Sequence, residues 1–444
     1  MTDITGLAFS FDQPDAITPT RPERRTMKED FLSCYIDYCG QTEVPAIFNR
    51  WAAITGLGAM LGRQYHFDHG HFHIYPNIYC MLIGSAGTRK GTAIKLMRKL
   101  VEQTGYNKFA AERTSKEKFL LDLAGEGSEG ELLTPEQLLD QNLFGDAASK
   151  ADCEMFVAID EFNDFIGNGN IEFISMLGNM WDYHGLYKNR IKTGKSVEIN
   201  NPTISIIGGN TPTGFSLAFP TDILGQGFFS RLLLIYADRT DRRITFPPPP
   251  PPERTAAILE QLKRIKQSAI GSARLTSGAE RLLDKIYQRG ISVDDVRFES
   301  YSNRRFTHLL KLCILSSAAR SSSRMEEQDI IYANTILSAA EHHMPRALGE
   351  FGKAKHSDVS HKIVQLAEST HQILTFKEIW KHVSNDLEKM SDLGTLLQNL
   401  VAAEKLQLVP GNKGFLPKRK IIEDVDSSMI DYSLLSAEER ACIK

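Results

Sequence analysis

A glycine-rich stretch at residues 83–94, IGSAGTRKGTAI, has residue types suited to binding phosphate. Its spacing follows the pattern G-x-x-x-x-G-K-[ST] in part, with Gly84 at the first glycine and Lys90 at the lysine. Arg89 stands at the second glycine, and Gly91 stands where a hydroxyl is usual. Backbone N–H groups at the positive end of a following helix attract phosphate. The candidate nucleotide-binding residues are therefore Gly84, Ser85, Ala86, Gly87, Thr88, Arg89, Lys90, Gly91 and Thr92. The alternative is a glycine-rich turn that only caps a helix.

Candidate magnesium ligands come from two segments. Thr92 carries the hydroxyl that follows the lysine most closely, because Thr88 lies inside the loop. The stretch MFVAIDEFNDF at residues 155–165 is an apolar run that ends in Asp160 and Glu161. Asp160 would hold Mg²⁺ directly or through water, and Glu161 would orient or deprotonate the attacking water. The alternative is an acidic strand end without a metal.

Two further polar residues follow apolar runs. Asn210 ends the run in NPTISIIGGNTPTGF, which we expect beside the strand that ends in Asp160, so that the amide can sense a γ-phosphate and position water. Arg231 precedes the apolar run in GQGFFSRLLLIYADRTD. An arginine there can face the nucleotide of a neighbouring subunit and stabilise charge in the transition state. The alternative for Arg231 is a structural or surface arginine.

The sequence patterns around these residues predict an α/β fold. IYCMLIG before the glycine-rich loop is a continuous apolar run, as in a strand that is buried on both faces. TAIKLMRKLVEQTG after the loop has helical periodicity and ends at Gly105. Residues 29–64 are expected to be helical, and QYHFDHGHFHIYPN is expected to be a β-hairpin that turns at residues 68–70.

The order of these motifs resembles that of AAA+ ATPases. FFSRLLLIYADRTD is similar to the arginine-finger segment of minichromosome-maintenance helicases, and GGNTP resembles their sensor-1 strand end. SNRRFTHLLKLCILSSAAR resembles their lid helix, with Arg304 at the sensor-2 position and Arg305 as the adjacent candidate. Residues 45–345 resemble more closely the P-loop ATPase domain of phage, plasmid and mobile-element helicases and primase-helicases. The resemblance implies a P-loop NTPase (AAA+-like) core that uses ATP and Mg²⁺, with catalytic residues Glu161, Asn210, Arg231 and Arg304.

A basic segment lies between the Asp160 and Asn210 motifs. GLYKNRIKTGKSVEIN at residues 185–200 has two alternating runs around Thr193-Gly194-Lys195, which predicts a β-hairpin. In minichromosome-maintenance and superfamily 3 helicases a hairpin in this place projects into the central channel. The resemblance implies that this segment contacts phosphates of single-stranded DNA through Lys188, Arg190, Lys192 and Lys195. The alternative is a solvated basic hairpin without a ligand.

The C-terminal fifth of the chain has a different pattern. Residues 355–420 read as three short helices and a hairpin that ends in a basic KRK, which predicts a winged helix that contacts DNA or, alternatively, protein. The expected organisation is a tail (1–28), a helical and hairpin region (29–76), the ATPase core (77–246), a polyproline strut (247–252), a helical lid (253–352), the winged helix (355–420) and a second tail (421–444) that docks a partner.

Composition restricts location and partners. Formal net charge is −3, so contact with nucleic acid must come from local patches. The six cysteines form no C-x-x-C, which favours a reducing cytoplasm. No apolar run is long enough to span a bilayer, so no membrane partner is expected.

Four histidines, at positions 66, 69, 71 and 73, are dense enough to suggest zinc. They alternate along the expected hairpin and no cysteine accompanies them, so we expect them to form a polar face of an exposed hairpin.

These patterns together predict a ring-forming, ATP-dependent DNA helicase or translocase, a homo-oligomer and typically a hexamer, that replicates a phage or mobile element. No primase-type acidic motif or zinc ribbon is found, so priming would require a separate primase or other replication protein. Two alternatives remain: a helicase loader without unwinding activity, and an initiator that binds an origin and uses ATP as a switch.

Overall fold

The computed structural model describes most of the chain. The described residues are 30–125, 153–190, 196–219, 223, 227–349, 357–370, 373–384, 386–387, 389–402, 406–409, 414–417 and 428–443. Within these residues, no helix combines the length and the apolar composition needed to cross a lipid bilayer.

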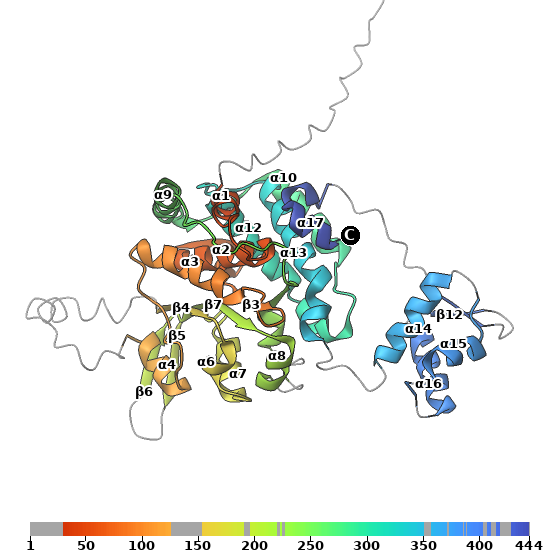
Figure 1. The fold of residues 1–444 in the computed structure, drawn as a ribbon. Coiled ribbons are helices and arrows are strands. Elements are labelled where there is room, and N and C mark those ends of the chain that lie inside the picture. The colour runs from red at the N-terminus through yellow and green to blue at the C-terminus, as the bar shows by residue number, and fades with distance from the viewer. Residues whose placement is uncertain are drawn as a thin grey trace, which may run out of the picture.

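A parallel sheet of four strands forms the centre of the fold, which confirms the α/β class (Figure 1). Its strands, in spatial order, are β4 (Glu154–Ile159), β7 (Thr203–Asn210), β3 (Tyr79–Ile83) and β8 (Leu232–Tyr236). These strands are almost wholly buried, as expected for the continuous apolar runs that a parallel sheet needs. An isolated parallel bridge from Phe109 to Phe156 extends the sheet beyond β4. The strand that ends in Asn210 does lie beside the strand that precedes Asp160, as the sequence predicts.

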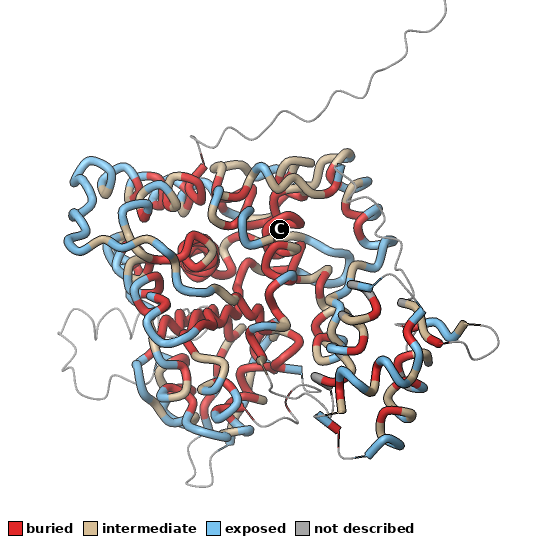
Figure 2. Tube along the Cα trace, turned by 45° about the vertical axis from the view of Figure 1, so that its right-hand side comes forward, coloured by how far each residue is buried: buried red, intermediate tan, exposed pale blue. Residues whose placement is uncertain are grey.

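Helices cover the two faces of this sheet (Figure 1). One side carries α2 (Ala46–Leu61) and α3 (Lys90–Gln103), with α1 (Phe31–Tyr38) packed against α2. The other side carries α6 (Phe162–Ile166), α7 (Ile171–Asn179) and α8 (Pro212–Ala218). Figure 2 shows that the buried part of the chain is concentrated around the sheet and these helices. The core therefore fixes both ends of every strand that leads to a candidate residue.

Two small hairpins lie outside the central sheet. In the first, β1 (Tyr65–His69) pairs antiparallel with β2 (Phe72–Ile74), and β9 (Gly271–Ser272) joins β1 in parallel. In the second, β5 (Leu186–Arg190) pairs antiparallel with β6 (Ser196–Asn200), and α4 (Lys116–Leu123) packs against β6. Both hairpins form where the sequence predicts them, but the first turns at Gly70 and His71 and not at residues 68–70, because Asp68 and His69 pair within the ladder. The turn of the second, at residues 191–195, lies outside the described residues.

A helical region follows the sheet, as predicted for residues 253–352. Prolines 247–251 are exposed, and Pro251 has φ −54° and ψ 135°, near polyproline II geometry. The sixth proline is the first residue of α9, where its fixed φ suits a helix start. The helices of this region are α9 (Pro252–Ser268), α10 (Ser277–Arg289), α11 (Glu299–Ser302), α12 (Arg305–Ala319) and α13 (Glu327–Leu348). Between them lie the 3-10 turn η3 (Val296–Phe298) and the short strands β10 (Arg274–Leu275) and β11 (Arg324–Met325). A further 3-10 turn, η2 (Phe229–Arg231), directly precedes β8.

A separate hydrophobic core holds the C-terminal unit together. Its helices are α14 (Ser357–Thr370), α15 (Phe376–Val383) and α16 (Met390–Ala402), and its strands β12 (Leu406–Leu408) and β13 (Phe415–Pro417) pair antiparallel. Leu374, between the first two helices, forms a further bridge to Phe415. The three helices and the hairpin match the predicted element order, and the basic residues 418–420 lie outside the described residues.

The last described segment returns to the main core. Residues 428–443, with η4 (Tyr432–Leu434) and α17 (Ala437–Ile443), pack against α2 and α13. Glu439 of α17 accepts two hydrogen bonds from Arg50 of α2, each 2.7 Å long, and both side chains are almost fully buried. Arg50 also donates to the hydroxyl of Tyr332. A segment expected to dock a partner thus contributes to the core of its own chain.

Candidate functional site

The glycine-rich loop connects β3 to α3 at the carboxyl edge of the sheet. A Cβ on Gly84 would lie 2.6 Å from the carbonyl oxygen of Ala237, so only glycine fits there. Arg89 has φ 63°, a left-handed conformation that glycine adopts freely and other residues adopt at a cost of about 1 kcal/mol. Its guanidinium pairs with Glu43, so a side-chain interaction holds the arginine in this conformation. The position that is usually glycine thus keeps a glycine-like backbone in this chain.

Lys90 turns its ammonium back into the loop. Its Nζ donates to the carbonyl oxygens of Gly84 (2.9 Å) and Ser85 (3.0 Å) and to the hydroxyl of Thr88 (3.1 Å). Burial lowers the pKa of the Lys90 ammonium, while the carboxylates of Glu161 and Asp160 act in the opposite direction. The lysine and the two acidic residues predicted from separate segments therefore lie close enough to interact electrostatically.

Asp160 lies directly against the start of α3. A Cβ on Gly91 would come 2.0 Å from Oδ1 of Asp160, so the carboxylate occupies the space that a side chain at position 91 would fill. Its other oxygen, Oδ2, is 3.0 Å from Nζ of Lys95. Thr92 is exposed and follows one residue later, a rotation of about 100° around the helix. The structure therefore brings the Asp160 carboxylate against position 91.

Asn210 bonds to Asn163, a residue that sequence reasoning did not identify. The buried amide of Asn210 donates to Oδ1 of Asn163 at 2.6 Å, and Asn163 donates to the carbonyl of Gly214. Asn163 lies two residues after Glu161, which is exposed at the N-cap of α6. A polar residue two positions after the acidic pair, in DEFND, was the available signal for Asn163.

Arg231 lies at the opposite edge of the sheet from the loop. Leu232, the next residue, pairs with Tyr79 at the start of β3, whereas the loop follows the end of β3. The five residues of β3 correspond to roughly 16 Å at about 3.3 Å per residue. Arg231 is half-buried, its NH1 group donates to the carbonyl of Gly227, and its Nε has no hydrogen-bond partner among the described residues.

Arg304 accompanies Arg231 at that edge. It is the N-cap residue of α12, and its charge, together with burial, lowers the pKa of Arg231. The carboxylate that opposes this shift is Asp182, which also forms an ion pair of 3.2 Å with the fully buried Lys311. Arg305, the adjacent candidate, is buried and bonds to Glu341 at 2.7 Å, so its guanidinium already has a structural partner.

The chain matches no known protein-family model, and no curated protein is similar to it in sequence. The roles of the candidate residues therefore depend on the geometry described above.

The β5–β6 hairpin carries the candidate DNA contacts. Lys188 forms an exposed ion pair of 2.7 Å with Glu198, and Arg190 is exposed at the end of β5. Side chains of β5 alternate between exposed and partly buried positions, whereas on β6 the buried residues Val197 and Ile199 alternate with more exposed ones. Lys192 and Lys195 lie outside the described residues, so their contacts stay a prediction.

Proposed function

We propose that this chain binds ATP with Mg²⁺ at residues 84–92 and hydrolyses it within a ring-shaped homo-oligomer that translocates along single-stranded DNA. The observation that carries the proposal is the meeting of Lys90, Asp160 and Asn210 at one edge of the sheet, at the ends of three adjacent strands. Ligands of parallel α/β sheets bind outside the carboxyl ends of the strands. A nucleotide-binding P-loop explains why a buried lysine, an acidic residue and a buried amide share this edge.

The loop supplies the phosphate site. The Lys90 ammonium is held by oxygens of Gly84, Ser85 and Thr88, which are weaker partners than a phosphate oxygen. Phosphate binding would transfer the ammonium from these oxygens to a charged ligand. The free N–H groups at the start of α3 would add the attraction of a helix N-terminus.

The residues present fit a magnesium ion, because the absent Cβ of Gly91 leaves a cradle in which the Asp160 carboxylate already lies. Asp160 would hold the ion, with the Thr92 hydroxyl as the second predicted ligand. Bound Mg²⁺ neutralises developing charge on the transferred phosphoryl group. Water would supply the remaining ligands, as is usual for Mg²⁺ held by one or two protein side chains.

Glu161 and Asn210 serve the attacking water. Glu161 is exposed beside Asp160 and can accept a proton or a hydrogen bond from water. Asn210 is fixed by Asn163, so an altered position of α6 would be transmitted to the buried amide.

Arg231 and Arg304 support an oligomer in which sites are completed by a neighbour. They lie at the edge of the sheet away from the loop of their own chain. Asp182 already pairs with the buried Lys311, so the charges of Arg231 and Arg304 are left in excess, which suits a γ-phosphate of another subunit. A hexameric ring is the predicted assembly.

The β5–β6 hairpin would contact DNA. It follows α7 and precedes β7, so movement of the strand that ends in Asn210 would be passed to the hairpin. Lys188, Arg190, Lys192 and Lys195 would contact phosphates, which give affinity and salt dependence without sequence preference. We infer a phage or mobile-element replicative helicase from this combination.

An origin-binding initiator that uses ATP as a switch is the second candidate. The separate core of residues 357–417 favours it, because a winged helix that folds as its own unit can bind duplex DNA without the ring.

The nucleotide site is tested with two variants. Glu161→Gln should bind a fluorescent ATP analogue with unchanged affinity and lose turnover, because this residue acts on water and not on the phosphates. Lys90→Ala should lose binding itself. Hydrolysis by Glu161→Gln at the wild-type rate would contradict the assignment.

The two candidate functions are separated by replacing residues 357–417 with a glycine-serine linker, which keeps α17 and its contact with Arg50. A helicase should retain ATPase activity stimulated by single-stranded DNA and strand displacement. An initiator should lose DNA stimulation and footprinting on the element's origin.

A further inference from the structure

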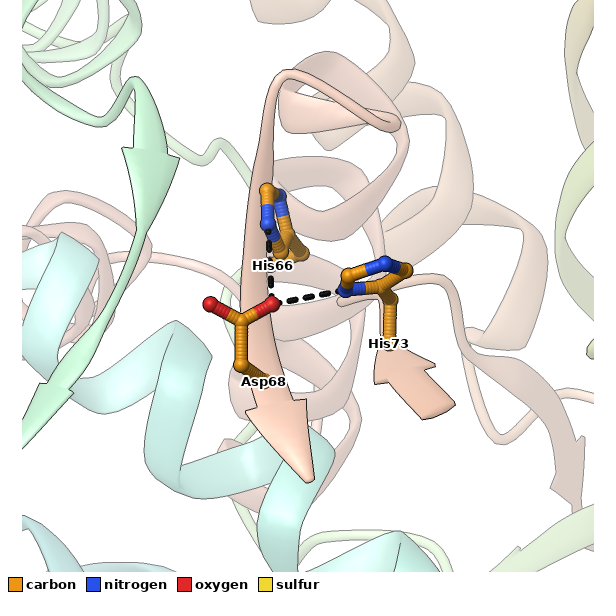
Figure 3. Close-up of side chains that lie close together, drawn as sticks. All are labelled: His66, Asp68 and His73. Atoms are coloured by element: carbon orange, nitrogen blue, oxygen red, sulfur yellow. Dashed lines mark hydrogen bonds and ion pairs between the residues drawn. The ribbon is translucent and has the colours of Figure 1, made fainter. Parts of the chain in front are cut away.

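The face of the first hairpin that carries His66 also carries Asp68 and His73. Asp68 pairs directly with His73 across β1 and β2, and His66 precedes Asp68 by two residues on the same strand. Residues two apart on a strand point to the same side. His69 pairs with Phe72 on the opposite face, and its ring contacts Phe306. The expectation of a single histidine face is therefore wrong: two of the four histidines converge, and an aspartate joins them (Figure 3).

Three ligand atoms converge on this face. Oδ1 of Asp68 is 2.6 Å from Nδ1 of His73 and 3.4 Å from Nε2 of His66 (Figure 3). All three groups can offer ligand atoms that lie within 4.8 Å of one another. In a tetrahedral zinc site with bonds of about 2.0–2.1 Å, neighbouring ligand atoms are about 3.3 Å apart. Small side-chain rotations would bring the three atoms to that spacing.

We propose that His66, Asp68 and His73 bind one zinc-class divalent metal ion, with a fourth position open to water.

Neighbouring residues hold the Asp68 carboxylate in an orientation that suits a metal ligand. The hydroxyl of Ser272 on β9 donates a hydrogen bond to the Asp68 carboxylate. Ser272 is placed by the parallel pairing of β9 with β1, in which it lies opposite His66. Oriented carboxylates of this kind are typical of metal sites, where partners outside the ligand set fix the ligands. Asp68 thus lies on a strand that pairs with a neighbouring strand on each side.

The donor set of the site also favours a metal. Groups that face the site from other segments are the rings of Tyr75 and His184, with Arg63 over the Tyr75 ring. Two imidazoles and one carboxylate suit zinc and related ions, whereas Mg²⁺ prefers oxygen ligands alone. This site is therefore chemically distinct from the proposed magnesium site.

A simpler alternative is a hydrogen-bonded cluster in which Asp68 only accepts protons from two imidazoles. The metal site and the hydrogen-bonded cluster are distinguished by titrating tag-free, chelator-treated full-length protein with Zn²⁺ against a chromophoric competitor. We expect one ion per chain for the wild type. His73→Ala and His66→Ala should weaken binding by more than about 100-fold, and Ser272→Ala by about 10-fold or more, in the range for partners that orient ligands. His71→Ala, in the turn of the same hairpin, is the matched control and should bind as the wild type does.

A second measurement guards against misfolding of the alanine variants. Asp68→Asn keeps the size of the side chain and removes its charge, and far-ultraviolet circular dichroism should be unchanged. Wild-type protein with Co²⁺ should show visible absorption that Asp68→Asn loses. The proposal is overturned if the wild type binds no zinc, or if the variants bind it as tightly as the His71→Ala control. Since the readout is metal binding, either result leaves the proposed ATPase activity to its own test.

Discussion

Replacing Gly91 with serine, a residue type that is usual at this position of the loop, should impair ATP hydrolysis. In Gly91→Ser the new Cβ would lie 2.0 Å from Oδ1 of Asp160, whereas ordinary contacts begin at 3.4 Å. The carboxylate must therefore retreat by about 1.4 Å, the difference between these two distances. A misplacement of about 1 Å in a catalytic group can lower a rate about 100-fold. We expect kcat for ATP hydrolysis to fall by about that factor, with nucleotide affinity changed little because Lys90 is untouched.

Stability should not explain that loss. The ion pair between Asp160 and Lys95 is exposed and contributes about 0–1 kcal/mol, while serine in place of glycine favours a helix by about 0.5 kcal/mol. The free energy of unfolding should thus change by less than about 1 kcal/mol. Lys95→Ala is the matched control, since it removes the ion pair without filling the space, and it should keep most of the activity. Steady-state hydrolysis, binding of a fluorescent analogue and thermal melting measure the three quantities. If Gly91→Ser hydrolyses ATP at the wild-type rate or faster, a side chain at position 91 does not displace the Asp160 carboxylate from a catalytic position.

Three other predictions concern the oligomer, pH and DNA. Arg231→Ala should bind ATP but hydrolyse it poorly, and mixing it with Lys90→Ala should restore part of the activity in mixed rings; the absence of recovery at every mixing ratio would count against a role in trans. Burial lowers the pKa of His308 from 6.5 to about 4, so the unfolded chain binds a proton that the folded chain does not. The free energy of unfolding should fall by about 2 kcal/mol between pH 7.5 and pH 5, measured in urea, and the His308→Gln variant should show a flatter profile. Lys195→Ala should keep basal ATPase activity, lose DNA stimulation and lower the salt slope of single-strand binding by about 0.7; an unchanged slope would remove this lysine from the DNA contacts.

Local pattern predicted the elements that carry the candidate site. The apolar run over residues 79–83 and the helical periodicity after it are properties of neighbouring residues, and both elements formed where expected. The adjacency of the strands that end near Asp160 and at Asn210 was also predicted, because polar residues after buried strands suggest a common edge.

Features that depend on distant packing were not predicted. The space at Gly91 is filled by a carboxylate 69 positions later (160 minus 91), which no local pattern reveals. The hydrogen bond between Asn163 and Asn210 depends on how α6 packs against β7. In the first hairpin, alternation was recognised, but the pairing register decided that Asp68 meets His73 and that His69 faces the other way.

The contact between Arg50 and Glu439 has a consequence for how the protein is made. The two residues are 389 positions apart, so Arg50 stays without this partner until residue 439 has been synthesised. Loss of α17 removes the ion pair together with the contacts of α17 with α2 and α13. Breaking a buried ion pair costs up to about 3–5 kcal/mol, a large part of a typical stability of about 5–15 kcal/mol. Chains that stop before Glu439 would therefore unfold readily and be exposed to proteases. Chains that include α17 would therefore be the ones that persist and assemble.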